Sequence, residues 1–219
     1  MKIYPTLLDD SLATIQAQLA ALKSMKHLSI LQIDIIDGEF VDNLTITPID
    51  LVGLDFGDLQ LDFHLMVHEP FDYVDEILNQ RETLPVRAII AQVERMSNQL
   101  EFIREVTKNK TKVGLSLDIF TPIEVVNDDA WAKLDVIQLM AVEAGFQGQS
   151  LKAIIFEKIK KLGAILTKFN AKCEIVIDGG VTLENVSQLH QVGVDAVGVG
   201  SALWRAKDPQ AVINQIRQL

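Results

Sequence analysis

The chain repeats one local pattern from end to end: a short apolar segment, then a polar or glycine-containing turn, then an amphipathic stretch. Short apolar runs bounded by turn residues are typical of buried strands, and apolar residues spaced three or four apart are typical of helices. About eight such units occur along the chain, and strands that alternate with helices predict a parallel sheet. The predicted strands are Ile3–Leu7, Ile30–Ile36, Leu61–Met66, Val86–Gln92, Val113–Leu117, Val136–Met140, Glu174–Asp178 and Ala196–Val199.

Two observations predict that this sheet closes into a barrel: the number of strand–helix units, and the absence of any linker or dinucleotide-binding motif. No linker, low-complexity tract or long internal repeat divides the 219 residues, and closed barrels of eight units commonly occupy roughly 200–250 residues. An open dinucleotide-binding sheet would carry a G-x-G-x-x-G motif after its first strand, and this chain has none there. We therefore predict a single (β/α)8 TIM barrel that forms one domain over residues 1–219.

The clearest helical pattern spans Leu151–Phe169. Apolar residues recur along one face of this segment, and its lysines, including Lys152 and Lys158, lie off that face. A basic face could indicate membrane binding, but an outer barrel helix with solvated lysines is strongly favoured over it. We predict an outer helix that presents these lysines to solvent.

The charge balance limits the partners that the protein can bind. The chain carries 20 Lys and Arg against 30 Asp and Glu, for a formal net charge of −10. Nucleic acids and anionic membranes both require a positive patch, so neither is expected. The start of the chain lacks a signal-peptide core, and no apolar run approaches the ~20 residues that span a bilayer. We expect a cytoplasmic protein that binds a small molecule and forms a homo-oligomer.

Polar side chains point into the predicted barrel near the carboxyl ends of three strands. Strand residues alternate between the two faces of a sheet, so the apolar neighbours of Gln32 and Asp34 suit the helix layer and turn these two residues inward. The same alternation turns Asp62, His64 and Met66 inward on the next strand. Each inward polar residue taken alone is commonly a hydrogen-bonded structural group.

A third strand ends in an acid. Asp178 closes its strand directly before two glycines, at the end of the barrel where such enzymes place their catalytic groups. The convergence of Asp34, His64 and Asp178 therefore predicts a functional site. Asp135 and Asp195 lie at strand beginnings, where residues contribute to stability, and we assign them no chemistry.

Glycines after the last three strands predict an anion site. Gly145-Phe146-Gln147-Gly148, Gly179-Gly180 and Gly200-Ser201 follow successive predicted strands. Glycines can serve simply as tight turns. However, the loops after the last two strands of such barrels commonly bind phosphate through backbone N–H groups. We therefore predict phosphate binding by Gly179, Gly180, Gly200 and Ser201.

These motifs together resemble those of the ribulose-phosphate 3-epimerase family. Ile33–Thr45 resembles the D-V-M-D-G-H-F-V-P-N-L-T stretch of that family, and Phe63–Val67 resembles its V-H-L-M-V. Val142–Gln149 resembles V-N-P-G-F-G-G-Q, Ile177–Val181 resembles V-D-G-G-V, and Gly200–Ala202 resembles G-S-A. The correspondence runs in the same order through almost the whole chain.

The resemblance implies a metal-assisted isomerase, without an organic cofactor, that inverts C3 of a phosphorylated ketose such as ribulose 5-phosphate. Such chemistry needs two acid/base groups and positive charge beside the enediolate. By this resemblance Asp34 and Asp178 are the acid/base groups and, with His64, the ligands of a divalent zinc, manganese, iron or magnesium ion. The residues expected to contact the substrate are Met66, Met140, Gly145, Phe146 and Gly148.

The chain departs from the family pattern at its expected metal ligands. Gln32 stands where the family has a histidine, and Asp9 where it has a serine; Gln92 also replaces a histidine. An amide oxygen is a harder and weaker ligand than imidazole, so zinc affinity should fall relative to that for manganese or magnesium. Asp9 is expected to add a compensating carboxylate to the metal site.

Three other functions remain open. One is a barrel that has lost epimerisation and only binds a sugar phosphate, and another is an isomerase of a related hexulose phosphate. A Schiff-base aldolase would need a lysine inside the barrel at a strand end, whereas Lys112 and Lys133 precede their strands.

Overall fold

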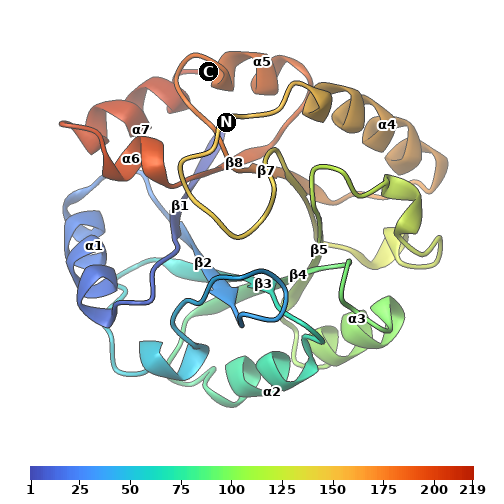
Figure 1. The fold of residues 1–219 in the computed structure, drawn as a ribbon, viewed down its shortest axis with the longest axis horizontal. Coiled ribbons are helices and arrows are strands. Elements are labelled where there is room, and N and C mark those ends of the chain that lie inside the picture. The colour runs from blue at the N-terminus through green and yellow to red at the C-terminus, as the bar shows by residue number, and fades with distance from the viewer.

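The computed structural model describes residues 1–219 as a closed barrel of eight parallel strands, in which each strand pairs with its neighbour in the chain and β8 pairs with β1. The predicted (β/α)8 TIM barrel is therefore confirmed, and the strands form an inner ring surrounded by helices (Figure 1). The strands are β1 (Lys2–Leu7), β2 (Ile30–Ile36), β3 (Gln60–Met66), β4 (Val86–Gln92), β5 (Lys112–Leu117), β6 (Val136–Met140), β7 (Glu174–Asp178) and β8 (Ala196–Val199).

Seven α-helices cover the outside of the barrel, and side-chain caps fix where several of them begin. Ser11 accepts a hydrogen bond from the Thr14 amide at the start of α1, and Asn98 accepts one from the Glu101 amide at the start of α3. The helices are α1 (Leu12–Ser24), α2 (Phe71–Asn79), α3 (Gln99–Lys108), α4 (Ile154–Lys168), α5 (Val186–Gln191), α6 (Ser201–Trp204) and α7 (Pro209–Arg217). None of them is both long enough and apolar enough to cross a bilayer.

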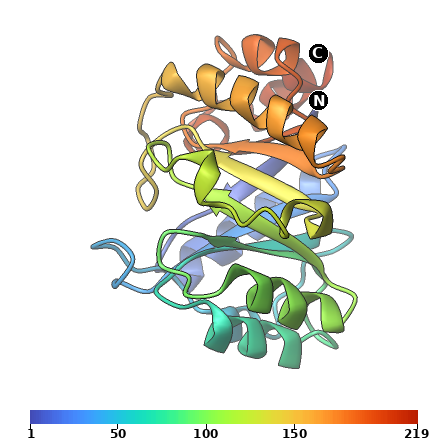
Figure 2. The same ribbon diagram turned by 90° about the vertical axis from the view of Figure 1, so that its right-hand side faces the viewer.

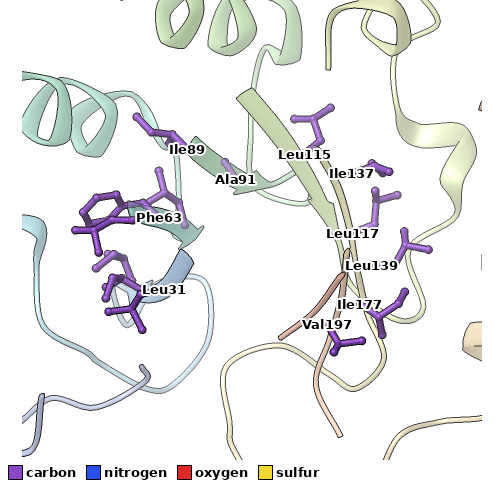
Figure 3. Packing of buried hydrophobic residues seen from close by; sticks show 14 of the residues in the cluster. Leu31, Phe63, Ile89, Ala91, Leu115, Leu117, Ile137, Leu139, Ile177 and Val197 are labelled. Atoms are coloured by element: carbon purple, nitrogen blue, oxygen red, sulfur yellow. The ribbon is translucent and has the colours of Figure 1, made fainter. Parts of the chain in front are cut away.

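Most of the hydrophobic core lies between the strands and the helices. Leu31 and Phe63 point from their strands into this layer, as do Leu115 and Ile137 on the other side of the barrel (Figure 3). The alternation predicted from the sequence is thereby confirmed, because the residues between these apolar side chains face the barrel interior. A smaller apolar cluster contains Tyr4, Ile30, Ala88, Ile90, Val136, Val176 and Ala196.

Two expectations about the helices are wrong. No α-helix follows β2 or β5; short 3-10 turns stand there instead, η1 (Pro48–Leu51), η2 (Ile123–Val125) and η3 (Trp131–Lys133). Helix α4 begins three residues later than predicted, because the Lys152 amide bonds to the Ala141 carbonyl and residues 151–153 belong to the loop.

Lys158 of α4 is buried rather than solvated. Its ammonium group donates to the backbone carbonyls of Asp118 and Ile119, in the loop that follows β5. Burial lowers the pKa of Lys158 to about 8, although the charges of Glu94 and Asp118 work in the opposite direction. Helix α4 therefore holds this loop through the buried Lys158 side chain. The sequence did not predict this burial, because Lys158 lies off the apolar face of the helix.

Two loops project from the carboxyl ends of the strands at one end of the barrel: the β2–β3 loop in light blue and the β6–α4 loop in gold (Figure 2). The β6–α4 loop crosses the barrel opening (Figure 1). Asn43 of the first loop donates to the Gly145 carbonyl at 2.6 Å, and Gln147 donates to the Leu8 carbonyl at 2.9 Å. These bonds hold the β6–α4 loop over the end of the barrel that the sequence predicts to be functional.

Candidate active site

Three side chains from different strands converge inside this end of the barrel. Asp34 on β2 lies beside His64 in the β2–β3 register, and Asp178 ends β7. All three residues are buried, and one ligand atom from each lies within 4.8 Å of the others. The convergence inferred from strand alternation is therefore present in the structure, and the group could hold a metal ion.

The polar contacts within the group are short and few. His64 Nδ1 lies 2.9 Å from Asp34 Oδ1 and 3.7 Å from Asp178 Oδ2. Gln32 Nε2 donates to Asp34 Oδ1 at 2.9 Å and to Asp178 Oδ2 at 2.6 Å, so one amide bridges the two carboxylates. Two acids are thus held together by one imidazole and by neutral amide hydrogens.

A second glutamine reaches the same carboxylate. Gln138 on β6 is fully buried and donates to Asp178 Oδ2 at 3.3 Å. Burial, followed by the nearby charge of Asp34, raises the pKa of Asp178 to about 6, while His64 and the Gln32 hydrogen bond act to lower it. A carboxyl group poised near neutral pH is suited to giving and taking protons.

The donor set fits a divalent cation. Carboxylate oxygens and an imidazole nitrogen are ligands that zinc and manganese accept, and Asp34, His64 and Asp178 supply one each. Gln32 Oε1 is buried without a hydrogen-bond partner. If the Gln32 amide turned over, it would present this oxygen to the same cation as a further ligand.

A cavity that opens to solvent lies directly above the group, and Asp34 and Asp178 are part of its wall. No lysine lines it, which leaves the Schiff-base aldolase without a nucleophile. All the residues predicted to contact substrate or phosphate line this cavity: Met66, Met140, Gly145, Phe146, Gly148, Gly179, Gly180, Gly200 and Ser201.

The glycines are required where the backbone crowds this cavity. Gly180 has a φ of +66°, and a Cβ there would lie 2.3 Å from the backbone nitrogen of Leu151. A Cβ on Gly198 would lie 2.7 Å from Asp178 Oδ1, and one on Gly200 would lie 2.6 Å from Thr6 Oγ1. A side chain at Gly198 would therefore collide with the Asp178 carboxylate, and side chains at Gly180 and Gly200 would collide with the Leu151 backbone and the Thr6 hydroxyl.

The structure does not bring Asp9 into the site. Its carboxylate accepts a hydrogen bond from the Ser11 amide at 2.9 Å, in the turn that leads into α1, and Asp9 is absent from the cavity wall. Asp9 lies beyond the end of β1, so strand alternation no longer directs its side chain inward. The proposed compensating ligand is therefore not supported.

Other polar residues lie outside the cavity. His68 is exposed and lies 3.9 Å from Glu39, apart from His64. Asp135 and Asp195 accept hydrogen bonds from the backbone amides of Val113 and Ile175 at strand beginnings, so their role is structural. They hold neighbouring strands together and take no part in the cavity.

Sequence reasoning missed two residues that the structure places at the site. Gln138 touches Asp178, and Thr6 lines the cavity. Strand alternation could have found both, because Gln138 lies two residues before the inward Met140 and Thr6 two residues after Tyr4.

Comparison with known proteins identifies the family. The model of the ribulose-phosphate 3 epimerase family matches residues 2–204. Ribulose-phosphate 3-epimerase of Bacillus subtilis is 28% identical over 99% of this chain and 98% of its own length. The enzyme of the same name from Schizosaccharomyces pombe is 29% identical over 99% of this chain and 92% of its own length.

Solved structures share the fold at low sequence identity. Mycobacterium tuberculosis tryptophan synthase superposes with a TM-score of 0.67 at 12% identity, covering 99% of this chain and 91% of that one. The 3-hexulose-6-phosphate synthase of Salmonella typhimurium superposes with a TM-score of 0.63 at 14% identity, covering 100% of this chain and 97% of that one. The family match, which extends over almost the whole chain, goes further: the chain belongs to the ribulose-phosphate 3-epimerase family, a family of isomerases.

Proposed function

We propose that the protein catalyses the 3-epimerisation of a phosphorylated ketose of the ribulose 5-phosphate and xylulose 5-phosphate type. The observation that carries this proposal is the pair of buried carboxylates, Asp34 and Asp178, which face one cavity from different strands and share His64 and Gln32 as partners. Epimerisation beside a ketone requires a proton to leave one face of the carbon and another to arrive on the opposite face. Two carboxylates can divide these tasks.

In this scheme one aspartate accepts the C3 proton while the other, protonated, delivers a proton to the opposite face. Because its pKa is raised to about 6, Asp178 takes up a proton more readily than an ordinary aspartate does, and we assign Asp34 as the group that begins as the base. For the reverse reaction the two aspartates exchange roles. Gln32 keeps both carboxylates on the same side of the cavity by donating to each.

A divalent metal would be held by Asp34, His64 and Asp178, with Gln32 able to turn its amide oxygen toward it. When bound, such an ion supplies positive charge that stabilises the developing enediolate oxygens. We propose manganese or magnesium in preference to zinc, because the set holds a single imidazole and otherwise only oxygen ligands.

The phosphate of the substrate would lie at the glycine-lined side of the cavity. Gly179, Gly180, Gly200 and Ser201 line this side, and backbone N–H groups in loops of this kind can bind anions. Met66 and Met140 form an apolar wall beside the carboxylates. Phosphate binding there would place the ketose end of the molecule over Asp34 and Asp178.

A second candidate is a sugar-phosphate-binding barrel that no longer epimerises, and the Gln32 amide is the observation that favours it. Its N–H groups bridge the carboxylates at the position where a cation would bind. If these hydrogen bonds persist, they compete with a metal ion for the same oxygens. A titration with Mn²⁺ separates the two candidates. The metal-dependent epimerase requires the Gln32 hydrogen bonds to break so that the cation can bind the carboxylates, whereas the binding protein does not.

The test is to incubate the metal-loaded protein with D-ribulose 5-phosphate and follow the sugar by NMR. Conversion to D-xylulose 5-phosphate until the two reach equilibrium is the expected result. Binding of the sugar phosphate without conversion, under every divalent metal tried, would favour the second candidate. An assay with a hexulose 6-phosphate as substrate examines the remaining alternative, an isomerase of a longer ketose.

A further inference from the structure

The wall of the cavity contains acidic side chains but no lysine or arginine. Asp34, Glu143 and Asp178 all line it. A phosphate ester adds about two negative charges at neutral pH, so these acids oppose its entry. Backbone N–H groups can bind the anion but carry no net charge that would balance the acids. A cation close to the wall would therefore favour the binding of a phosphorylated substrate.

The guanidinium group of Arg205 lies against the rim of this wall. A Cβ on Gly148, which is a wall residue, would lie 3.1 Å from Nη2 of Arg205, 3.5 Å from Nη1 and 3.7 Å from Cζ. Gly148 has a φ of +82°, a backbone conformation that side chains rarely adopt. The guanidinium therefore occupies the space that a side chain at position 148 would take, and Gly148 has no side chain to separate it from the cavity.

The backbone of Arg205 is held beside the glycine-lined side of the cavity. Its amide donates to the Ser201 carbonyl at 3.0 Å, which places Arg205 one helical turn after a wall residue. The preceding residue, Trp204, donates from its indole nitrogen to the Thr6 carbonyl at 2.8 Å, and Thr6 is also part of the wall. The β6–α4 loop, which contains Gly148, passes beside α6 (Figure 1). Arg205 therefore lies where this loop meets the proposed phosphate site.

The guanidinium group has no partner within the chain. It forms no ion pair and donates no hydrogen bond, and Arg205 is exposed. By contrast, Lys152 near the end of the β6–α4 loop is already paired with Glu143 at 3.0 Å. A guanidinium presents five N–H donors in a planar fork that matches the oxygens of a phosphate group. These donors remain available to an anion at the rim of the cavity.

We propose that Arg205 is a specificity-determining residue, which binds the phosphate of the substrate and selects phosphorylated over unphosphorylated ketoses. Its guanidinium reaches past Gly148 and donates to the oxygens of a phosphate held at Gly200 and Ser201. The phosphate is remote from the reacting carbon, so this contact acts on the bound substrate and on the transition state alike. The selection among ketoses rests on the proposed function, whereas the binding of phosphate does not depend on catalysis.

The first test measures the affinity of the metal-free protein for inorganic phosphate by calorimetry. Arg205→Met removes the charge and should weaken binding by about 10-fold, the loss expected for one hydrogen bond between charged groups. Arg205→Lys keeps the charge without the fork and should recover part of the affinity. Arg217→Met removes an exposed arginine beside Lys2, at the other end of the barrel, and should leave the affinity unchanged.

Added salt distinguishes a direct contact from a distant attraction. The Debye length falls from about 10 Å in 0.1 M salt to about 3 Å in 1 M salt, so a charge that acts only from a distance loses its effect. The difference between the wild type and Arg205→Met should therefore largely persist when NaCl is raised from about 0.1 M to about 0.5 M. A difference that disappears at the higher concentration would overturn the proposed contact.

The second readout is the kinetics of the metal-loaded protein with D-ribulose 5-phosphate. In Arg205→Met the loss should appear as a KM raised by about 10-fold rather than as a lower kcat. The preference in kcat/KM for D-ribulose 5-phosphate over D-ribulose should fall by the same factor.

The outcomes for this inference and for the proposed function differ. If Arg205→Met weakens phosphate binding but the wild type epimerises no ketose, the proposed function is refuted and the contact between Arg205 and phosphate stands. If the wild type epimerises D-ribulose 5-phosphate but Arg205→Met changes neither the phosphate affinity nor KM, this inference is overturned and the proposed function stands. A wild-type protein that binds no phosphate would also overturn this inference.

Discussion

The two ends of the barrel interior each contain a buried group of charged residues, and they differ in how the charges are balanced. At the amino-terminal end, Arg87 donates through Nε to Asp62 at 2.6 Å and through Nη1 to Glu174 at 3.1 Å. Lys2 and Tyr4 each donate to Glu174 Oε1 at 2.6 Å. Burial works to raise the pKa of Glu174, but the bonds from Lys2 and Tyr4 and the charge of Arg87 lower it overall.

At the carboxyl-terminal end the balance is incomplete. Asp34 and Asp178 face one imidazole and two amides, and the amide oxygens of Gln32 and Gln138 have no partner. In the amino-terminal group the two acids, Asp62 and Glu174, are balanced by two cations, Arg87 and Lys2. Each charge therefore has an oppositely charged partner within the group. The carboxyl-terminal group needs a cation or a proton to complete it, which is what a catalytic site requires and a structural one avoids.

The largest expected effect comes from removing one of the two proposed acid/base groups. Asp34→Asn and Asp178→Asn should each reduce C3 proton exchange by at least about 10²- to 10⁴-fold, because a missing acid or base blocks proton transfer at one face. Proton exchange measured by NMR, with circular dichroism to check the fold, gives the result. The matched change at the other end, Asp62→Asn, should leave the catalytic rate close to that of the wild type. Equal losses in all three variants would show that the two ends do not differ in function.

The amino-terminal group should instead matter for stability. Arg87→Met leaves Asp62 buried without its bidentate partner and should lower the free energy of unfolding by about 3–5 kcal/mol. Urea unfolding followed by circular dichroism measures this loss. We expect the folded fraction to retain its epimerase rate at low temperature. A loss of activity without a loss of stability would place this group in the catalytic machinery.

Strand alternation was enough to predict which residues meet at the carboxyl-terminal end. Asp34, His64 and Asp178 occupy inward positions at strand ends, and their positions depend only on the period of the strands and on barrel closure. The pairing of Asp62 with Arg87 was out of reach, because a one-residue irregularity in the β3–β4 pairing interrupts the regular register there. Asp9 was misplaced because it lies past its strand, and Lys158 because its partners are carbonyls of a distant loop.

An imidazole added at the carboxyl-terminal end should increase the metal affinity of that end alone. Gln32→His removes the bridging amide and supplies a second nitrogen ligand, so zinc affinity should rise by roughly 10-fold or more, and C3 exchange should rise with it. Calorimetric titration of both forms with Zn²⁺ and Mn²⁺ measures the change. If neither metal binds more tightly after the substitution, position 32 does not face the metal.

The anion site can be tested without any metal. Inorganic phosphate should stabilise the folded protein and so raise its melting temperature. At a phosphate concentration one hundred times Kd, the free energy of unfolding should increase by about 2.7 kcal/mol. Gly200→Asp should abolish this protection, because its carboxylate would enter the cavity beside Thr6 and repel the anion. Gly163→Asp adds the same charge on α4, where a Cβ has open space, and should keep it. Protection that survives in Gly200→Asp would move the anion site elsewhere.

The smallest effect concerns Lys158. Its folded-state pKa of about 8 lies below the ordinary value of 10.5, so the unfolded chain binds more protons between these values and stability rises with pH in that range. The free energy of unfolding should rise by about 1 kcal/mol from pH 8 to pH 10 relative to Lys158→Met, less than full linkage because Glu94 and Asp118 lie nearby and solvent screens the charge. A parallel pH dependence in the two proteins would contradict the burial of this cation.

The most direct measurement of the difference between the two ends is deuterium incorporation at C3 of D-ribulose 5-phosphate in D₂O. It is made on protein stripped of metal, on the same protein reloaded with Mn²⁺, and on reloaded Asp62→Asn as the control from the amino-terminal end. We expect exchange to be slow in the stripped protein, restored by Mn²⁺, and preserved in Asp62→Asn. Absence of exchange in the reloaded protein, with the sugar phosphate bound, would contradict the assignment of Asp34 and Asp178 as the acid/base pair.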